Sequence, residues 1–460
     1  MGGTHEFEGG LQVKKATILG AGVSGLSASY HVGHEQCTIY EASNQYGGHC
    51  ASEIRDGFTW DDGPHVNFGS HENVAELFGE GVNNEVLEFI PVMSNYYQGH
   101  YIDHPAQSNL YQVPEPLRAK CLKSFLETRA PEGSQAQPKN YKEWLHQAFG
   151  PVFADTFPAA YTRKYWTTDP VNLGIDWVAF PSARLPRRTS GSGPTRVYYP
   201  SAQDVTDGSQ GPLGRSTHYV KDFRYPSRGG FGAFLRKLAD GAHINYQKSL
   251  QWINFSKREM GFADGTRTTY DKLVSTIPLP VLIQCAQDAP AEVHDANAKL
   301  RCTNFLLVEV AANHPTKRQE HWMYVYDEDK LSVRISVTER FSPNNAPSGT
   351  TGISVEVYGS PHRPVPTDHK EVARRVQLEL IEMGLIDSIE AIMSTHVRYV
   401  PWANVIFDHD REPALKKIMG FLESHGVLTL GRYAEWEYLM THDCVVASKQ
   451  VAQKVLSDIR

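Results

Sequence analysis

Hydrophobic and polar positions near the start of the chain follow a strand–helix–strand order. Residues 16–19 are a short apolar run, residues 23–32 have the spacing of a helix, and residues 37–40 form a second apolar run. The first run leads directly into glycines, and the second ends at Glu41. The pattern predicts a β-α-β unit.

The middle of the chain is predicted to contain helices and then a loop. Residues 109–166 have apolar positions three and four apart, which favours several helices. Residues 189–217 are dense in Ser, Gly, Pro and Thr, which predicts a long mobile loop.

Alternation typical of strands dominates the region that follows. Residues 243–278 predict an antiparallel meander with a hairpin at Asp264-Gly265 and a last buried strand at residues 273–276. Residues 303–360 are rich in β-branched and aromatic residues, which predicts a second, largely antiparallel sheet.

The end of the chain returns to mixed elements. A helix is expected at residues 370–383 because its apolar positions share one face. A short strand is expected at residues 428–430, and a closing amphipathic helix at residues 448–459.

Length and composition limit the classes of protein. A chain of 460 residues is too long for one core, so two or three subdomains are expected. The net charge of −7, with both signs mixed, argues against a nucleic acid or an anionic membrane as partner. No apolar run is long enough to cross a membrane. Six scattered cysteines without metal spacing indicate reduced thiols, so we expect a cytoplasmic protein without a metal site.

The glycine-rich segment after the first strand carries the clearest chemical signal. Gly20-Ala21-Gly22-Val23-Ser24-Gly25 follows a strand and opens a helix, so backbone N–H groups can face a pyrophosphate. Glu41 ends the second strand, where a carboxylate can accept hydrogen bonds from ribose hydroxyls. A turn that merely requires glycine would not explain Glu41. We therefore predict a dinucleotide site.

Later blocks indicate FAD rather than NAD. Gly47-Gly48, residues 61–65 and Gly431-Arg432 are similar to blocks with which flavoproteins contact FAD. The residues expected to bind FAD are Gly20, Gly22, Val23, Ser24, Gly25, Glu41, Gly47, Gly48, His65, Leu250, Gly431 and Arg432.

The expected fold class is α/β, with a discontinuous Rossmann-type FAD-binding domain, a helical insert and an antiparallel sheet domain for the substrate. The predicted ranges are 11–105, 223–285 and 425–460 for the FAD-binding domain, 106–175 for the helical insert, and 176–222 and 286–424 for the sheet domain.

From about residue 15 to its end, the chain resembles UDP-galactopyranose mutases more closely than amine oxidases or protoporphyrinogen oxidases. The order and spacing of several motifs together carry the resemblance. These motifs are GGH (47–49), GFTWDDGPHVNF (57–68), YTRKYWTTDP (161–170), RLPRR (184–188), YPSRGG (225–230), WMY (322–324), SVRISV (332–337) and GRYAEWEY (431–438).

The resemblance implies a flavin-dependent isomerase that interconverts the pyranose and furanose forms of a nucleotide sugar. In that family the reduced flavin attacks the anomeric carbon through N5, and the nucleoside diphosphate leaves and returns. No net oxidation occurs. The protein supplies position and charge.

Candidate residues for the diphosphate follow from the resemblance. Arg184 and Arg334 match the two arginines that grip it, and a guanidinium can bind phosphate oxygens with two hydrogen bonds. Arg187 and Arg188 could substitute for Arg184. The alternative for each arginine is a surface ion pair. We group Arg184 and Arg334 with His65, which matches a histidine beside the flavin, as the catalytic set.

Other matches belong to the substrate. Tyr324 and Tyr438 match tyrosines whose hydroxyls bind the diphosphate, although a tyrosine in a sheet is more often a packing residue. Further matches are expected near the nucleotide, with core packing as the alternative: Gln107, Tyr161, Thr162 and Trp166.

Some positions depart from the family pattern. Trp402-Ala403-Asn404 stands where a tyrosine that touches the diphosphate is usual, and His442 stands near a usual Asn or Asp. Such changes alter specificity because a polar pocket rejects wrong substrates strongly. The sugar, the base and the retention of mutase activity therefore stay open.

Two rival functions share the FAD signals. The first is an FAD-dependent oxidase of the amine-oxidase or protoporphyrinogen-oxidase type, which has no use for Arg184 and Arg334. The second is a non-catalytic FAD-binding protein. For the mutase, the expected partners are a nucleotide-sugar substrate and a reductant such as NAD(P)H, and a homo-oligomer stays open.

Overall fold

The computed structural model describes residues 15–68, 72–128, 137–179, 201–214 and 221–459. Contacts divide the chain into two compact units. The first consists of Met1–Gly48, Leu238–His294 and Lys417–Arg460, and the second of His49–Lys237 and Asp295–Lys416. The predicted domain ranges stay a prediction. They differ from these units chiefly at residues 49–105, which group with the second unit.

The first unit contains a five-stranded sheet and a three-stranded sheet with helices. Its elements are β1 (Ala16–Leu19), α1 (Val23–Val32), η1 (His34–Gln36), β2 (Cys37–Tyr40), β9 (Ile244–Asn245), β10 (Leu250–Asn254), β11 (Glu259–Phe262), β12 (Arg267–Thr269), β13 (Lys272–Ser275), α10 (Leu279–Gln284), β19 (Leu428–Thr429) and α15 (Thr441–Ile459). Three α-helices cross the boundaries between the units: α9 (Arg236–Ala239), α11 (Ala291–Asn297) and α14 (Arg411–Ser424). The helical turn η2 (Gly48–Cys50) begins at the last residue before such a boundary.

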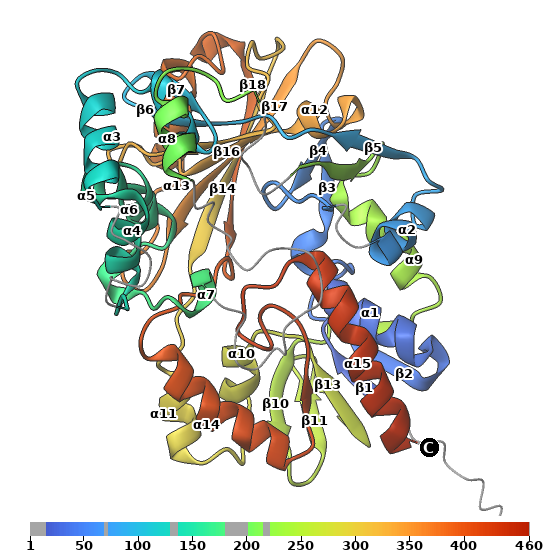
Figure 1. The fold of residues 1–460 in the computed structure, drawn as a ribbon. Helices are drawn as coiled ribbons and strands as arrows, with labels where there is room; N and C mark the ends of the chain where they lie inside the picture. The colour runs from blue at the N-terminus through green and yellow to red at the C-terminus, as the bar shows by residue number, and fades with distance from the viewer. Residues whose placement is uncertain (1–14, 69–71, 129–136, 180–200, 215–220, 460) are drawn as a thin grey trace, which may run out of the picture. The chain divides into compact units, whose positions relative to one another are not determined.

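The five-stranded sheet has the order β19-β13-β1-β2-β9, and all its pairs are parallel. All four residues of β1 are buried, as expected of a central strand in a parallel sheet. Helices α1 and α15 pack against each other beside this sheet (Figure 1). The predicted β-α-β unit is confirmed at its predicted residues.

Within the predicted meander, strands β10, β11 and β12 are antiparallel as expected. The meander was wrong at its two ends, because β9 and β13 pair in parallel with β2 and β1. Gly265 has a φ of 84°, which is why the hairpin between β11 and β12 requires glycine.

The closing helix begins earlier than predicted. α15 begins at Thr441 rather than at residue 448. The Asp443 carboxylate accepts a hydrogen bond from the Met440 N–H, so the first turn is capped by a polar side chain. That turn buries polar residues, including His442, which the apolar pattern could not indicate.

The second unit contains the larger sheet and most of the helices. Its strands are β3 (Ser52–Arg55), β4 (Phe58–Asp61), β5 (Val86–Phe89), β6 (Met93–Tyr97), β7 (His100–Asp103), β8 (Phe223–Pro226), β14 (Asn304–Ala312), β15 (Trp322–Val325), β16 (Arg334–Val337), β17 (Thr351–Gly359) and β18 (Ile392–Val400). Its helices and helical turns are η2 (Gly48–Cys50), α2 (Glu72–Glu80), η3 (Ala106–Ser108), η4 (Leu110–Gln112), α3 (Leu117–Thr128), α4 (Tyr141–Phe149), α5 (Pro151–Thr156), α6 (Pro158–Tyr165), η5 (Pro170–Asn172), α7 (Asp176–Ala179), α8 (Ala202–Gly208), η6 (Phe231–Leu235), α12 (Thr338–Phe341), η7 (Pro343–Asn345), α13 (His369–Glu382) and η8 (Ile389–Ala391).

The seven-stranded sheet has the order β18-β14-β17-β16-β15-β6-β7. All its pairs are antiparallel except β15 with β6, so the predicted second sheet is confirmed. One face forms a core with α13, in which Val308, Val355 and Val376 are fully buried. The opposite face carries charged and aromatic residues. With both sheets present, the predicted α/β class is confirmed.

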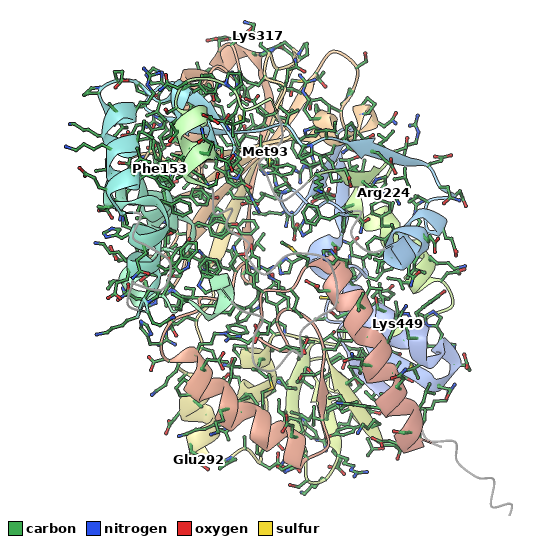
Figure 2. All side chains as sticks on the ribbon, viewed as in Figure 1. Met93, Phe153, Arg224, Glu292, Lys317 and Lys449 are labelled. Atoms are coloured by element: carbon green, nitrogen blue, oxygen red, sulfur yellow. The ribbon has the colours of Figure 1, made fainter. Side chains whose placement is uncertain are left out.

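Helices α3 to α6 lie together beside the larger sheet (Figure 1). Figure 2 shows Phe153 among these helices. Its ring centroid lies 5.7 Å from that of Phe149 and 5.0 Å from that of Phe157. The helices predicted within residues 109–166 are therefore confirmed.

The predicted loop at residues 189–217 was wrong in one part. Residues 202–208 form α8, while residues 189–200 and 215–217 lie outside the described residues. The Ser201 hydroxyl caps this helix by accepting from the Asp204 N–H. Gly208 packs so closely on Ser108 of η3 that a Cβ would overlap the Ser108 carbonyl. This contact is distant in sequence, so composition could not indicate it.

Among the described residues, no helix combines the length and the apolar character needed to cross a membrane.

A buried histidine in the second unit predicts a loss of stability in acid. His321 is 6% exposed, and its Nδ1 accepts a hydrogen bond from the Val92 N–H. Burial lowers the pKa of His321 to about 4. The unfolded chain binds this proton near pH 6.5, whereas the folded chain binds it only near pH 4. The neutral ring therefore makes its full contribution to the free energy of unfolding above pH 6.5. This contribution is lost as the pH falls toward 4, by about 3 kcal/mol in total.

Urea unfolding of wild type and His321→Gln between pH 7 and pH 4 measures this contribution. The difference between the two unfolding free energies is expected to shrink as the pH falls. A difference that does not change with pH would contradict the assignment.

Candidate active site

The turn between β1 and α1 in the first unit is built for close backbone approach. Gly20 has a φ of 97°, and a Cβ there would lie 2.6 Å from the Thr276 hydroxyl oxygen. A Cβ on Gly25 would overlap the carbonyl oxygen of Gly20. Both glycines are therefore required by the geometry of the turn itself.

The N-terminus of α1 has no side-chain cap. Its N-cap is Gly22, and the first turn contains no acidic residue. The N–H groups at the start of a helix carry partial positive charge and suit a phosphate. An uncapped glycine turn of this kind therefore fits the diphosphate of FAD.

The Glu41 carboxylate is held beside the same turn. One oxygen accepts from the Ala21 N–H at 2.7 Å, and the other accepts from the Ser43 N–H at 2.8 Å. Each oxygen has a further lone pair, so the carboxylate can also accept from a ribose hydroxyl. This fits the role predicted for Glu41.

The third segment of the first unit returns to this helix. A Cβ on Gly431, whose φ is 100°, would overlap the Ser24 hydroxyl oxygen in the first turn of α1. The Arg432 guanidinium lies 4.1 Å from the ring centroid of Tyr438 and donates to the Leu439 carbonyl at 3.1 Å. The ring of Tyr438, which was predicted to bind the substrate, thus contacts the guanidinium of Arg432, which was predicted to bind the cofactor.

The other predicted cofactor residues have different places. Gly47 pairs with Gly22 through an isolated bridge, and its N–H donates to the Ala21 carbonyl at 2.9 Å. Gly48 follows with a φ of 56°. Leu250 begins β10 in the three-stranded sheet. Their contacts with FAD, like that of Val23, stay predictions.

In the second unit, a row of paired positions crosses the face of the sheet opposite α13. Tyr324 pairs with Asn95 and with Arg334, Arg334 with Glu356, and Glu356 with Leu307. Paired residues in adjacent strands share a face. The row therefore places Tyr324, Arg334 and Glu356 side by side.

Arg334 forms a bidentate ion pair with Glu356. Its Nε and Nη2 donate to the two carboxylate oxygens at 2.8 and 2.7 Å. The Arg334 side chain is 22% exposed and that of Glu356 is 1% exposed. Burial alone would lower the pKa of Arg334, but the Glu356 carboxylate raises it well above its usual value. Arg334 is therefore a permanent cation with a fixed orientation.

Hydroxyl-bearing rings surround this pair. Tyr358 donates to Glu356 at 2.9 Å, and Tyr165 lies 4.7 Å from the Tyr358 ring between centroids. Tyr161 of α6 contacts Tyr165 and Tyr324, both at 5.5 Å between ring centroids. We call Arg334, Glu356, Tyr161, Tyr165, Tyr324 and Tyr358 the arginine–tyrosine cluster.

Tyr161 is unusual within this cluster. Its hydroxyl is buried and has no hydrogen-bond partner among the described residues. Burial raises its pKa well above the usual value, so the hydroxyl keeps its proton and can donate. A buried donor without a partner is costly, which is the signature of a site that a ligand completes.

His65 lies next to the cluster through its own loop. Gly63 has a φ of 89°, and a Cβ there would overlap the Glu356 carboxylate. The His65 ring packs on Phe231, and its Nδ1 lies 3.3 Å from the Gly63 carbonyl. Burial lowers the pKa of His65 to about 4, so the ring is neutral at neutral pH. With Nδ1–H donating to Gly63, Nε2 is an acceptor.

Other predicted substrate residues are placed differently. The Thr162 hydroxyl donates to the Pro158 carbonyl within α6, and Trp166 is buried against Tyr165 and Trp177. Gln107 lies in η3, on which α8 packs. Their contacts with a nucleotide stay predictions. Arg184, Arg187 and Arg188 lie outside the described residues.

Sequence reasoning missed three members of the cluster. The motifs gave no role to Tyr165 or Tyr358, and Glu356 was not singled out. One signal could have identified Glu356, because it is an acidic residue within the apolar strand β17, which is buried along its whole length. Asn404, noted as a departure, donates to the Tyr358 hydroxyl at 3.4 Å.

Comparisons with known proteins show chains of similar fold. The chain is similar in fold to reduced UDP-galactopyranose mutase, with a TM-score of 0.85 and 21% identity over 96% of both chains. It is also similar to a protoporphyrinogen oxidase homologue from Exiguobacterium sp. 255-15, with a TM-score of 0.72 and 14% identity over 97% of this chain and 99% of the other. A putrescine oxidase variant has a TM-score of 0.64 and 11% identity, over 96% and 99% of the two chains.

One curated relative is similar over a short stretch. Protoporphyrinogen oxidase 2 of Arabidopsis thaliana is 31% identical over 78 residues, which span 16% of this chain and 15% of the relative. The family described as flavin containing amine oxidoreductase matches residues 23–456. With that match over almost its full length, and a glycine turn that fits a dinucleotide, the chain belongs to the flavin containing amine oxidoreductase family, with FAD as its cofactor.

Proposed function

We propose that this protein is a mutase that interconverts the pyranose and furanose forms of a nucleotide sugar such as UDP-galactopyranose. The observation that supports this most is the arginine–tyrosine cluster. It combines a permanent cation with a buried hydroxyl donor that has no partner among the described residues. A diphosphate can accept hydrogen bonds from both groups and is attracted by the cation, whereas a hydrocarbon substrate can accept from neither and an amine gains nothing from a cation.

Each residue of the cluster has a distinct role in this proposal. Glu356 accepts from Nε and Nη2 of Arg334, which leaves the two N–H groups of Nη1 and one of Nη2 as donors for the diphosphate. The Tyr161 hydroxyl donates a second hydrogen bond, and Tyr324 adds a third. Arg184 is proposed as a further cation for the same group. Together they hold the nucleoside diphosphate after the glycosidic bond breaks and return it to the same carbon.

Breaking and re-forming the bond between the anomeric carbon and the diphosphate requires little acid or base catalysis from ionisable side chains. FAD, when bound and reduced, supplies the nucleophile for the anomeric carbon. His65 is neutral, so its Nε2 can accept a hydrogen bond without adding charge beside the cofactor. The protein thus supplies orientation and exclusion of water.

Anaerobic product analysis tests the proposal directly. Dithionite-reduced enzyme is incubated with UDP-, GDP-, CDP- and TDP-sugars, and the ring form of each product is determined. Conversion between pyranose and furanose, without oxygen uptake, is expected for at least one of them. Absence of conversion and of any flavin spectral change with all four nucleotides would refute it.

An FAD-dependent oxidase is the alternative. The family description and the likeness to protoporphyrinogen oxidase and putrescine oxidase folds favour it. An oxidase consumes dioxygen and releases peroxide when its substrate is added, and a mutase does neither. Oxygen uptake during turnover therefore separates the two functions.

Tyr161→Phe is expected to weaken binding of a nucleoside diphosphate by about 1.5–3 kcal/mol while leaving stability unchanged or higher. The hydroxyl has no hydrogen-bond partner in the described chain, so its removal takes away a desolvation cost and one bond to the ligand. Titration of the flavin spectrum with UDP and thermal unfolding measure the two effects.

Tyr101→Phe is the matched control. The Tyr101 hydroxyl donates to the Met383 carbonyl at 2.6 Å, so its loss should lower stability by about 1 kcal/mol and leave UDP binding unchanged. Equal UDP binding by Tyr161→Phe and wild type would contradict the role of Tyr161.

A further inference from the structure

A buried cation lies in the second unit outside the arginine–tyrosine cluster. Lys164 of α6 is 2% exposed. Its Nζ donates to the carbonyl oxygens of Asp327 at 2.6 Å and of Ser332 at 2.7 Å. Both belong to residues 326–333, which join β15 to β16 and which we call the strand connector. A single ammonium group thus binds the connector near both of its ends.

The strand connector is held from its other side by a buried carboxylate. Glu379 of α13 accepts from the Leu331 N–H at 2.8 Å and from the N–H and hydroxyl of Ser332 at 2.9 and 2.6 Å. Lys164 therefore satisfies carbonyl groups, and Glu379 satisfies amide groups. Together they restrict the connector to one conformation.

Lys164 links α6, which carries Tyr161 and Tyr165, to the connector that leads into Arg334. On α6 it lies between Tyr161 and Tyr165, and the strand connector ends at the residue before Arg334. Any shift of α6 against the connector would therefore change the distance between the Tyr161 hydroxyl and the Arg334 guanidinium. That distance decides whether one diphosphate can contact both groups.

We propose that Lys164 is a positioning residue of the substrate site, which sets the spacing of Tyr161 and Arg334 by binding the strand connector to α6. This inference rests on the proposed function, because it assigns the spacing to a nucleoside diphosphate. Lys164 acts through its neighbours and does not itself contact the ligand.

A second contact between α6 and the strand connector indicates that Lys164 fixes the spacing of the two and is not needed merely to attach them. Arg163 binds Glu328 of the connector with two hydrogen bonds of 2.7 Å, and this pair is partly exposed. The connector is thus already attached to α6 at the surface. A buried ammonium costs free energy, as the pKa of Lys164, lowered by burial to about 7, also indicates. We attribute the retention of this cost to the fixed geometry that the substrate site needs.

Lys164→Met tests the proposal in the full-length, FAD-loaded protein. Methionine keeps the length of the side chain and removes its donors. We expect the FAD content of the purified protein to be unchanged and the dissociation constant for UDP to rise at least tenfold. Glu328→Gln removes the ion pair from the exposed tie to the same connector, keeps one acceptor oxygen, and is expected to leave that constant within twofold of wild type.

The readout separates positioning from general stability. A purely structural role would reduce the fraction of folded, flavin-loaded protein and leave the UDP dissociation constant of that fraction unchanged. Lys164→Gln keeps N–H donors on a shorter chain, so we expect an intermediate constant. If Lys164→Met does not fold, the constant of Lys164→Gln decides, and a value equal to wild type overturns the proposal.

Amide hydrogen exchange distinguishes a failure of this inference from a failure of the proposed function. Amides of residues 158–166 and 331–337 should exchange faster in Lys164→Met or Lys164→Gln than in wild type, and Glu328→Gln should not change them. If wild type binds no nucleoside diphosphate, the proposed function fails, whereas unchanged exchange in the Lys164 variants overturns the tie itself. Faster exchange with unchanged UDP affinity overturns the positioning role.

Discussion

Replacing Arg334 by alanine is expected to abolish turnover of the nucleotide sugar and to weaken nucleoside diphosphate binding by about 2–5 kcal/mol, while FAD stays bound. The guanidinium is the permanent cation of the arginine–tyrosine cluster, and no other described member of the cluster carries a positive charge. Turnover under anaerobic conditions and UDP titration of the flavin spectrum measure the loss.

The same substitution also lowers stability, and this must be separated from function. Arg334→Ala leaves the Glu356 carboxylate buried without its ion-pair partner, which costs about 3 kcal/mol or more. A double variant, Arg334→Met with Glu356→Gln, removes both charges and is expected to recover most of that stability. It should still fail to bind UDP, because the cation is absent.

Arg398→Met is a control on the same face of the sheet. Arg398 pairs with Asp62 and Glu309, and three strand spacings, about 14 Å, separate it from Arg334. Its loss should reduce stability and leave UDP binding unchanged. Full activity of Arg334→Ala, or equal loss of UDP binding in Arg398→Met, would remove the basis for the proposed diphosphate site.

Gly25→Ala is expected to abolish FAD binding and to destabilise the first unit by about 3 kcal/mol or more. The added methyl group would overlap the Gly20 carbonyl oxygen, so the turn between β1 and α1 must open. We predict that this turn presents the helix N-terminus to the diphosphate of FAD. The ratio of flavin absorbance to protein and the midpoint of thermal unfolding measure both effects.

Gly420→Ala is the matched control in the same unit. Gly420 lies within α14, and a Cβ there meets no atom within 4 Å. Alanine should stabilise the helix by about 1 kcal/mol and leave FAD binding unchanged. A Gly25→Ala protein that retains its FAD would show that the turn tolerates a side chain and that the predicted contact is wrong.

Local patterns predicted much of the fold. β1, α1 and β2 occur at their predicted residues because each is defined by its own spacing of apolar residues and by the glycines between them. α8 was missed because its sequence contains one large apolar residue, Val205, and its packing depends on η3, almost a hundred residues earlier in the chain. Long-range packing of this kind leaves no periodic signal.

The candidate site was predictable only in part. Arg334, Tyr161 and Tyr324 were identified through motifs, and the structure brings them together. The pairing of Arg334 with Glu356 depends on the register between β16 and β17, which the residues of either strand do not encode alone. Lys164 was overlooked for the same reason, because its partners are backbone carbonyls of the distant strand connector.

The order of strands in the first unit has a consequence for biosynthesis. Its parallel sheet takes β1 and β2 from the first segment, β9 and β13 from the second, and β19 from the third. A ribosome releases β1 and β2 almost four hundred residues before β19, and α15, which covers α1, follows last. The nascent chain must therefore keep exposed strand edges unpaired for most of its translation. We expect its folding to be slow and to depend on chaperones that shield those edges until the last segment is complete.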